Sequence, residues 1–425
     1  MTTFDQRLEE VRTGFERPFW IANVSEIFER LSYYGAFSSL ALYLQGKLNF
    51  STEQTGTLTG LFGGMVWFLA IFGGAIADKL GFRRALSLAY LILAAAYFLI
   101  GSIGASWLAP IRGAVPLSLF VGVILILPAL GIALVKPCVV GTTARASKEN
   151  VRSLGYSIYY TMVNIGGTAG PFVADWAHTH FGLERVFRIS ALSVFVMFFF
   201  VLAFFRDPRK PGDAPPPSVL QVVRNFIAIL WPPRFLIFLL IFTGYWIVFW
   251  QQYTSLPGFI HTYVDAKARV ELILITDAAV VVCLTFAVNY LARRIPPFQA
   301  VILGTIVSSL SWLILAFWPT VVGAVTSIAV LALGEIIQQP PYYAYISRLA
   351  PPGQQGTYMG FAFLPIGIGS LVGGWFGGRV MHHFGEVLHH PEFAWCAISA
   401  VGFATALLLF IYDRAVKASG QESVS

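Results

Sequence analysis

The sequence predicts an all-α membrane protein with twelve transmembrane helices in two six-helix bundles. Hydrophobic residues make up 57% of the 425 residues and charged residues only 12%, about half the charged share of soluble domains. The apolar residues form long segments, whereas a β-barrel would show short alternating ones. One long polar connection divides these segments six and six. This composition excludes disordered, collagen-like, coiled-coil and nucleic-acid-binding proteins.

Each predicted helix is long enough to cross a hydrocarbon core of about 30 Å at about 1.5 Å per residue. The expected spans are residues 18–44, 56–77, 85–104, 114–144, 154–178, 186–205, 235–263, 269–291, 298–318, 321–348, 354–382 and 393–413. A cytoplasmic linker at residues 206–233, which contains three consecutive prolines, is expected to separate an N-terminal bundle (1–205) from a C-terminal bundle (234–425). Two such halves are typical of transporters with a site between repeats.

The basic residues predict the orientation of the chain in the membrane. With the N-terminus inside, 19 of the 28 Lys and Arg fall on the cytoplasmic side and seven on the outer side, while Arg30 and Lys136 lie within spans. Positive residues concentrate in cytoplasmic loops. Both termini are therefore expected in the cytoplasm of a protein of the cell (inner) membrane, and the lipid bilayer explains the basic balance. The polar N-terminus lacks the apolar core of a signal peptide.

Neither the cysteines nor the histidines predict a metal site or a cofactor. Cys138, Cys283 and Cys396 each lie inside an apolar segment, without the spacing of a disulfide framework or a zinc site. Four histidines flank the last outer loop, but nothing fixes a ligand geometry there. We expect no metal and no cofactor.

Six ionisable residues lie well within the predicted spans, and each costs about 2.5–3.5 kcal/mol at the bilayer centre. We expect them to face a hydrated interior and to pair with one another. They are Glu26, Glu29, Arg30, Lys136, Asp277 and Glu335.

In the first span, Glu26, Glu29, Arg30 and Tyr33 share one helical face through their i, i+3, i+4 and i+7 spacing. One interpretation is a structural ion pair between Glu26 and Arg30. Two carboxylates around one Arg favour a second interpretation, a proton relay, because one carboxyl can hold a proton while the other stays paired.

The loop after the second span resembles the signature G-x-x-x-D-R/K-x-G-R-R of the major facilitator superfamily. Its residues are Gly74, Asp78, Lys79, Gly81, Arg83 and Arg84. An Asp at a helix end followed by basic residues can latch neighbouring helices in one state and release them in another. The alternative is an ordinary positive cytoplasmic loop.

Four further blocks resemble the proton-dependent oligopeptide transporter family within that superfamily. The first span matches E-x-x-E-R-F-x-Y-Y-G except that Leu31 replaces Phe. Residues 131–139 resemble the fourth-helix block G-x-G-G-I-K-P, and residues 159–166 resemble the fifth-helix block F-Y-x-x-I-N-x-G. Residues 334–340, with Leu349-Ala350-Pro351 and Met359-Gly360, resemble blocks of the tenth and eleventh helices.

The resemblance implies a major facilitator fold, alternating access and a role for each matching residue. Glu26, Glu29 and Arg30 would couple protons to transport, together with Lys136, which would meet a substrate carboxylate or those acids. Asn164 and Glu335 would hold an amino group. Tyr33, Tyr34 and Tyr160 would line the pocket, with aromatic packing as the alternative. The expected partners are protons and a small solute, first of all a di- or tripeptide.

Three departures from the family pattern widen the choice of substrate. Phe37 occupies a position where the family usually has Arg, and the seventh helix carries Trp250-Gln251 where the family has Glu-Gln. The family's salt bridge between these positions is therefore lost as a unit. Asp277, aligned where Asn is frequent, adds an anion that can bind a cationic solute. The alternative is a proton-coupled carrier of another cationic or zwitterionic solute, such as an amino acid derivative or a drug. A membrane receptor or enzyme is the rival class, but the chain shows no catalytic constellation and no long sensing loop.

Overall fold

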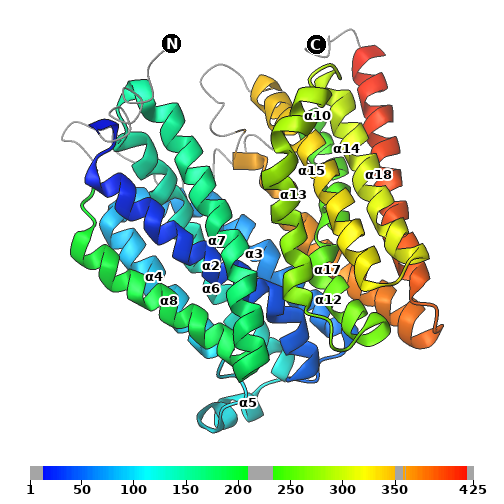
Figure 1. The fold of residues 1–425 in the computed structure, drawn as a ribbon, viewed down its shortest axis with the longest axis horizontal. Coiled ribbons are helices and arrows are strands. Elements are labelled where there is room, and N and C mark those ends of the chain that lie inside the picture. Colours follow the sequence, from blue (N-terminus) through cyan, green and yellow to red (C-terminus); the bar gives the residue numbers. More distant parts are fainter. Residues whose placement is uncertain (1–12, 209–232, 350–357, 359, 419–425) are drawn as a thin grey trace. The chain divides into compact units, whose positions relative to one another are not determined.

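The structure is a computed structural model, which describes residues 13–208, 233–349, 358 and 360–418 (Figure 1). Within these ranges the chain folds into helices joined by short connections. They are α2 (Arg17–Gly46), α3 (Thr52–Leu80), α4 (Phe82–Ile100), η1 (Ser106–Leu108), α5 (Ala109–Ala114), α6 (Leu117–Arg145), η2 (Glu149–Val151), α7 (Arg152–Phe181), α8 (Leu183–Phe204), α10 (Pro233–Phe249), α11 (Gln251–Thr254), α12 (Leu256–Phe259), η3 (Ile260–Val264), α13 (Val270–Ala292), α14 (Pro297–Phe317), α15 (Val321–Leu349), α17 (Leu364–Met381), η4 (His382–Val387) and α18 (Glu392–Ala418).

The described residues contain twelve long helical segments when the run from α10 to η3 is counted as one. Eight of the described helices are long and apolar enough to cross a membrane, or nine when the bent α3 counts as one span. The remaining long helices are α2, α7 and α17, which are rich in charged, polar or glycine residues. The prediction of an all-α membrane fold is confirmed. Ala350, Pro351 and Met359 of the sequence motifs, and most of the predicted linker, lie outside the described residues.

The chain forms two compact units, whose boundary passes through helices α2 and α3. Among the described residues, unit 1 takes those up to Ala36 and from Leu69 to 208, and unit 2 takes Phe37–Phe68 and everything from 233 onward. The C-terminal part of α2 and the N-terminal part of α3 thus pack with the second half of the chain. The expected division at residues 206–233 stays a prediction.

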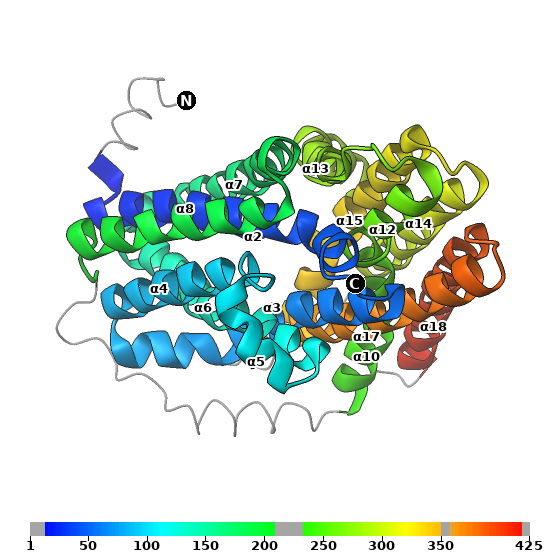
Figure 2. The same cartoon turned by 90° about the horizontal axis from the view of Figure 1, so that it is seen from below.

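In unit 1, α4 lies beside both α6 and α8, and α7 packs on α6 and α8 (Figure 2). Two helix junctions need glycine: Gly81 joins α3 to α4 with φ 84°, and Gly182 joins α7 to α8 with φ 88°. That backbone region is costly for residues with a Cβ. Helices α2 and α7 cross closely, since a Cβ on Gly170 would lie 2.5 Å from the carbonyl oxygen of Leu31. Small residues permit such backbone approach in membrane helices.

In unit 2, α14 lies beside α15 and α18, and α10 packs on α17 and α18. Stacked rings fill this interior, for example Trp312 on Trp395 with centroids 4.7 Å apart. A glycine seam joins α3 to α17 and consists of Gly56, Gly60, Gly374 and Gly378. A Cβ on Gly56 or on Gly60 would lie 2.5 Å from a carbonyl oxygen of α17, so the two backbones touch without intervening side chains.

Candidate functional site

The predicted acid–base cluster of α2 is assembled in unit 1. Arg30 Nε lies 2.5 Å from Glu29 Oε2 and 3.6 Å from Glu26 Oε1. The Arg30 guanidinium also lies 5.0 Å from the centroid of the Tyr33 ring and 6.0 Å from that of Tyr34, which is within the range of cation–π attraction. The Arg30 guanidinium therefore interacts with two carboxylates and with two aromatic rings.

This cluster is buried, contrary to the expectation that it faces a hydrated interior. Glu26 and Glu29 are 0% exposed and Arg30 is 2% exposed. Tyr90 and Tyr97 of α4 lie near the two carboxylates and help to enclose them. Periodicity along α2 indicated which residues share a face, but it did not show that α4 covers that face with two tyrosines.

Lys136 of α6 joins the same cluster electrostatically, because it interacts with both Glu26 and Glu29. It lies beside Pro137, which is inside α6. Proline has no N–H, so the carbonyl of Ala133, four residues earlier, loses its donor within the helix. Gly73 of α3 packs against that carbonyl, where a side chain would clash. Helix α6 thus continues through Pro137 but lacks one backbone hydrogen bond next to Lys136.

The other predicted residues of unit 1 are more accessible. Tyr34, Lys136 and Asn164 are half-buried, and Tyr160 is 56% exposed. Asn164 Nδ2 donates to the carbonyl oxygen of Tyr160 at 2.8 Å, one turn earlier in α7. These side chains are the part of the predicted site that solvent can reach, whereas Arg30 and Tyr33 are covered.

In unit 2, Asp277 of α13 and Glu335 of α15 form a pair of interacting carboxylates. Gln339 Nε2 donates to Glu335 Oε1 at 3.0 Å. Gln252 lies near Asp277, yet Asp277 Oδ1 has no hydrogen-bond partner among the described residues. Two adjacent carboxylates away from bulk water favour a shared proton or a bound cation. The structure thus brings together two acids that were predicted separately.

The G-x-x-x-D-x-x-G-x-R-R segment forms the corner between α3 and α4. Gly81 makes the turn, and Phe82 N–H donates to Asp207 Oδ2 at 2.6 Å. Arg83 Nη2 donates to the carbonyl oxygen of Leu202 near the end of α8 at 2.7 Å. The corner therefore ties α4 to the end of α8. Gly74, Asp78 and Arg84 belong to the same segment of unit 1.

Phe37 and Trp250 lie together in unit 2, as the paired departure from the family pattern suggested. Phe37 is 1% exposed and stacks on Tyr253 at 4.7 Å between centroids, with Phe62 at 5.2 Å and Trp250 at 5.7 Å. Trp250 Nε1 donates to the carbonyl oxygen of Ile366 at 3.0 Å. An aromatic cluster thus occupies these positions in unit 2.

Sequence reasoning missed two acids that the structure gives a role. Glu271 is 1% exposed near the start of α13 and accepts a hydrogen bond from Ser39 Oγ at 3.0 Å. Asp207 caps α4 from 125 positions away in the chain. Glu271 could have been found from its place inside a predicted span, whereas nothing local marks Asp207.

A chain of long apolar helices with ionisable groups inside them is a polytopic membrane transporter. A family description, Major Facilitator Superfamily, matches residues 24–374 and 270–424. The chain belongs to this superfamily and has its fold, and it is a transporter, not an enzyme.

Among curated proteins, the multidrug resistance protein MdtH of Edwardsiella ictaluri (strain 93-146) is 24% identical over 388 residues, covering 89% of this chain and 90% of that protein. MdtH of Salmonella newport (strain SL254) is 23% identical over 380 residues, with the same coverage.

Among solved structures, a POT family transporter in complex with 5-aminolevulinic acid superposes with a TM-score of 0.76 at 14% identity, covering 94% of this chain and 96% of that one. A peptide transporter POT in complex with sulfate gives 0.73 at 18% identity, covering 95% and 94%. The nucleoside transporter NupG gives 0.72 at 13% identity, covering 93% and 99%. These similarities establish the shared fold.

Proposed function

We propose that the protein is a proton-coupled symporter of small zwitterionic solutes, with di- and tripeptides as the first substrate class, working by alternating access in the cell membrane. The observation that carries the proposal is the cluster of two acids and two bases in unit 1, in which Glu26, Glu29 and Arg30 are buried and Lys136 is half-buried. Buried ionisable groups in membrane spans mark proton or substrate pathways.

Within this cluster, Glu26 is the candidate carrier of the proton. Neither of its carboxylate oxygens has a hydrogen-bond partner among the described residues, whereas Glu29 Oε2 lies 2.5 Å from Arg30. A buried carboxylate without hydrogen bonds is costly when ionised. Glu29 therefore remains the ionised partner of Arg30, and Glu26 gains and loses the proton.

The charged ends of a zwitterion need opposite charges in the site. Lys136 would meet the carboxylate, while Glu335, with Asn164 and Asp277, would meet the amine. Tyr34 and Tyr160 present accessible rings to the solute between these ends. Both termini of this proposed symporter would lie in the cytoplasm.

A second candidate function is proton-coupled carriage of organic cations, including drugs. Two observations favour it: the curated relatives are named as multidrug resistance proteins, and Asp277 and Glu335 interact as two acids. Such a carrier would use the acid pair for the cation and would depend less on Lys136.

Uptake into proteoliposomes with an imposed proton gradient tests both candidates. The panel contains an acidic, a neutral and a basic dipeptide, C-terminally amidated dipeptides and an organic cation. Accumulation of free dipeptides with the inward proton gradient supports the proposal. Movement of the organic cation alone selects the second candidate, and equal movement of every solute without a gradient contradicts both.

Two variants assign the roles in the same assay. Glu26→Gln should abolish gradient-driven accumulation while substrate exchange persists, with Asp175→Asn as the control for loss of another buried acid of unit 1. Asp277→Asn should shift preference from solutes with net positive charge toward neutral ones. Wild-type pH dependence in Glu26→Gln would show that the cluster is only structural.

A further inference from the structure

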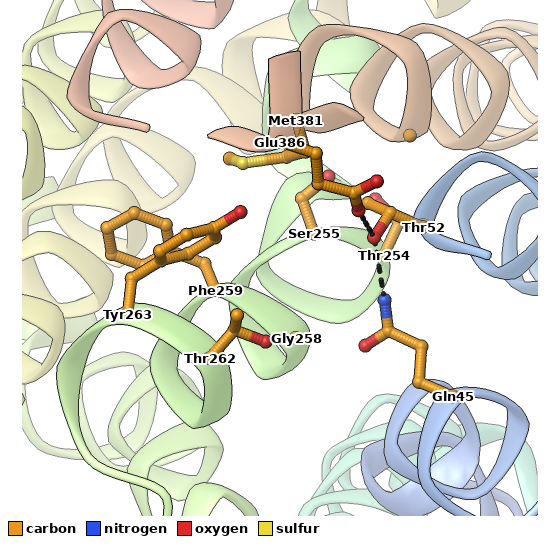
Figure 3. A pocket seen from close by; sticks show the side chains of 11 residues that line it. Gln45, Thr52, Thr254, Ser255, Gly258, Phe259, Thr262, Tyr263, Met381 and Glu386 are labelled. Atoms are coloured by element: carbon orange, nitrogen blue, oxygen red, sulfur yellow. Dashed lines mark hydrogen bonds between the residues drawn. The ribbon is translucent and has the colours of Figure 1, made fainter. Parts of the chain in front are cut away.

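A pocket of about 300 Å³ lies entirely within unit 2, apart from the residues considered so far (Figure 3). Its walls come from α2, α3, α11, α12, η3, α17 and η4. The pocket lies beside η4, the connection before α18, and α18 runs for 27 residues from there to its end. With the C-terminus in the cytoplasm, the pocket is therefore at the outer end of the unit.

A single carboxylate is fixed at one wall of this pocket. Glu386 Oε1 accepts a hydrogen bond from Thr52 Oγ1 at 2.5 Å, and Thr52 Oγ1 accepts one from Gln45 Nε2 at 3.2 Å. Glu386 Oε2 lies 2.6 Å from His382 Nδ1. Thr52 of α3 and His382 of the same η4 segment thus hold the carboxylate in place. A neutral His382 that donates its Nδ1–H leaves a full negative charge on Glu386.

Two aromatic rings form the adjacent wall. Phe259 and Tyr263 lie with their centroids 5.6 Å apart and their planes at 43°. Gly385 lets the Tyr263 hydroxyl approach, because a Cβ there would lie 2.5 Å from Tyr263 Oη. The Tyr263 ring lines the pocket, and the face of such a ring is negative and attracts cations.

The remaining wall is polar but uncharged. Thr254 and Ser255 both donate to Gln251 Oε1, at 3.3 Å and 2.6 Å, which fixes their orientation. Of the residues that line the pocket, Glu386 is the one with a charge at neutral pH. A cavity with one fixed anion, two ring faces and no lining cation has the chemistry that recognises an organic ammonium group.

We propose that this outer pocket of unit 2 is a binding site for a small organic cation, with the Glu386 carboxylate facing the ammonium group and Phe259 and Tyr263 facing its carbon atoms. Glu386 is partly exposed, 42% of its side chain, so binding is weak, on the order of millimolar. The site is distinct from the residues proposed for transport, and binding there needs no transport.

The chain contains a matched control for this site. Glu392 lies 2.9 Å from His390 Nδ1, and its side chain is 39% exposed. The two His–Glu pairs resemble each other in partner and exposure, but Glu392 does not line the pocket. Any effect of general surface charge should appear equally in both.

Saturation-transfer difference NMR on the full chain in maltoside micelles, at mildly alkaline pH, tests the proposal. The probes are choline and its uncharged carbon isostere. Choline should bind about tenfold more tightly than the isostere, and Glu386→Gln should weaken choline binding about tenfold. Tyr263→Leu should weaken it severalfold, Tyr263→Phe should retain it, and Glu392→Gln should leave it unchanged.

Several results would overturn the proposal. Equal binding of choline and its isostere would remove the role of charge, and equal losses in Glu386→Gln and Glu392→Gln would reduce it to surface electrostatics. If Glu335→Gln removes choline binding while Glu386→Gln does not, the cation binds at the proposed transport site instead. Should Glu386→Gln fail to fold, the comparison of Tyr263→Leu with Tyr263→Phe decides. Choline binding without any solute uptake would contradict the proposed function but not this site.

Discussion

Lys136 and Arg30 are the two cations of the cluster in unit 1, and they differ in exposure to solvent. Arg30 is 2% exposed and held by Glu29, whereas Lys136 is half-buried next to Pro137. A compact ammonium on a flexible stem can change partners more readily than a guanidinium bound in a fixed geometry. We therefore assign contact with the solute to Lys136 and a fixed structural charge to Arg30.

Lys136→Ala should selectively weaken solutes that carry a free carboxylate. The loss should be about 1.5–3 kcal/mol, the size of a hydrogen bond to a charged group, for a free dipeptide and close to zero for its amide. Competition binding measures both. Lys148→Ala serves as the control, because Lys148 lies in the connection between α6 and α7, outside the long helices. Equal losses for the acid and the amide would contradict the assignment.

The sequence predicted the contents of this cluster better than its surroundings. The spacing of Glu26, Glu29 and Arg30 requires no tertiary information, because residues one turn apart on a helix are neighbours. The cover provided by Tyr90 and Tyr97, and the meeting of Asp277 with Glu335, depend on which helices pack together. No local pattern specifies those contacts.

At the scale of elements, α2 and the segment from α10 to α11 contact each other through aromatic rings rather than through an ion pair. Phe37, Phe62, Trp250 and Tyr253 form this aromatic cluster. A buried ion pair can often be replaced by packed apolar groups without loss of stability. Removing both partners of a pair together avoids the larger cost of one isolated buried charge.

Restoring the ion pair tests this interpretation. Phe37→Arg alone should lower the apparent melting temperature strongly, since it buries a cation without a carboxylate and removes ring packing. Adding Trp250→Glu should recover part of the loss, with a coupling of about 0.5–3 kcal/mol in a double-mutant cycle. Strictly additive effects would show that positions 37 and 250 are not energetically coupled. The aromatic contact between them would then not be a replacement for an ion pair.

The crossing of α2 and α7 makes a separate prediction. Gly170→Ala should destabilise unit 1 by about 1–3 kcal/mol, because the new methyl group would lie 2.5 Å from the Leu31 carbonyl oxygen and 2.8 Å from Gly35 N. Gly46→Ala is the control, since nothing lies within 4 Å of a Cβ there. Thermal unfolding of the purified variants measures the difference, and equal melting temperatures would rule out a tight crossing.

At the scale of the whole molecule, contacts group parts of the chain that are distant in sequence. Proline content and polarity predict a connection at 206–233, and contacts group Phe37–Phe68 with the second half of the chain. The boundary between the units falls inside α2, after Ala36, and inside α3, after Phe68. Hydropathy finds spans well, yet it carries no information on which spans share a core.

The expected orientation is tested by cysteine labelling in intact cells. Cysteines introduced at Arg83 and at Lys267, in a Cys283→Ser background, should be labelled by an impermeant reagent only at position 267. The reason is the excess of Lys and Arg on the side that contains Arg83. Labelling of position 83 from outside would invert the topology and with it the direction assigned to the transport cycle.

The glycine seam between α3 and α17 has a kinetic consequence. Gly56 and Gly60 touch the backbone of α17 directly, and Ser370 Oγ donates to the carbonyl oxygen of Gly60 at 3.1 Å. Because backbone rather than side chains meets at Gly56 and Gly60, a shift of α17 along α3 would break the Ser370–Gly60 hydrogen bond but would need little rotamer rearrangement at these two positions. Shear of packed helices is one form of conformational switching, and such collective motions take microseconds to milliseconds. The contact between these glycines is therefore a place where such a shear motion of α3 and α17 can occur.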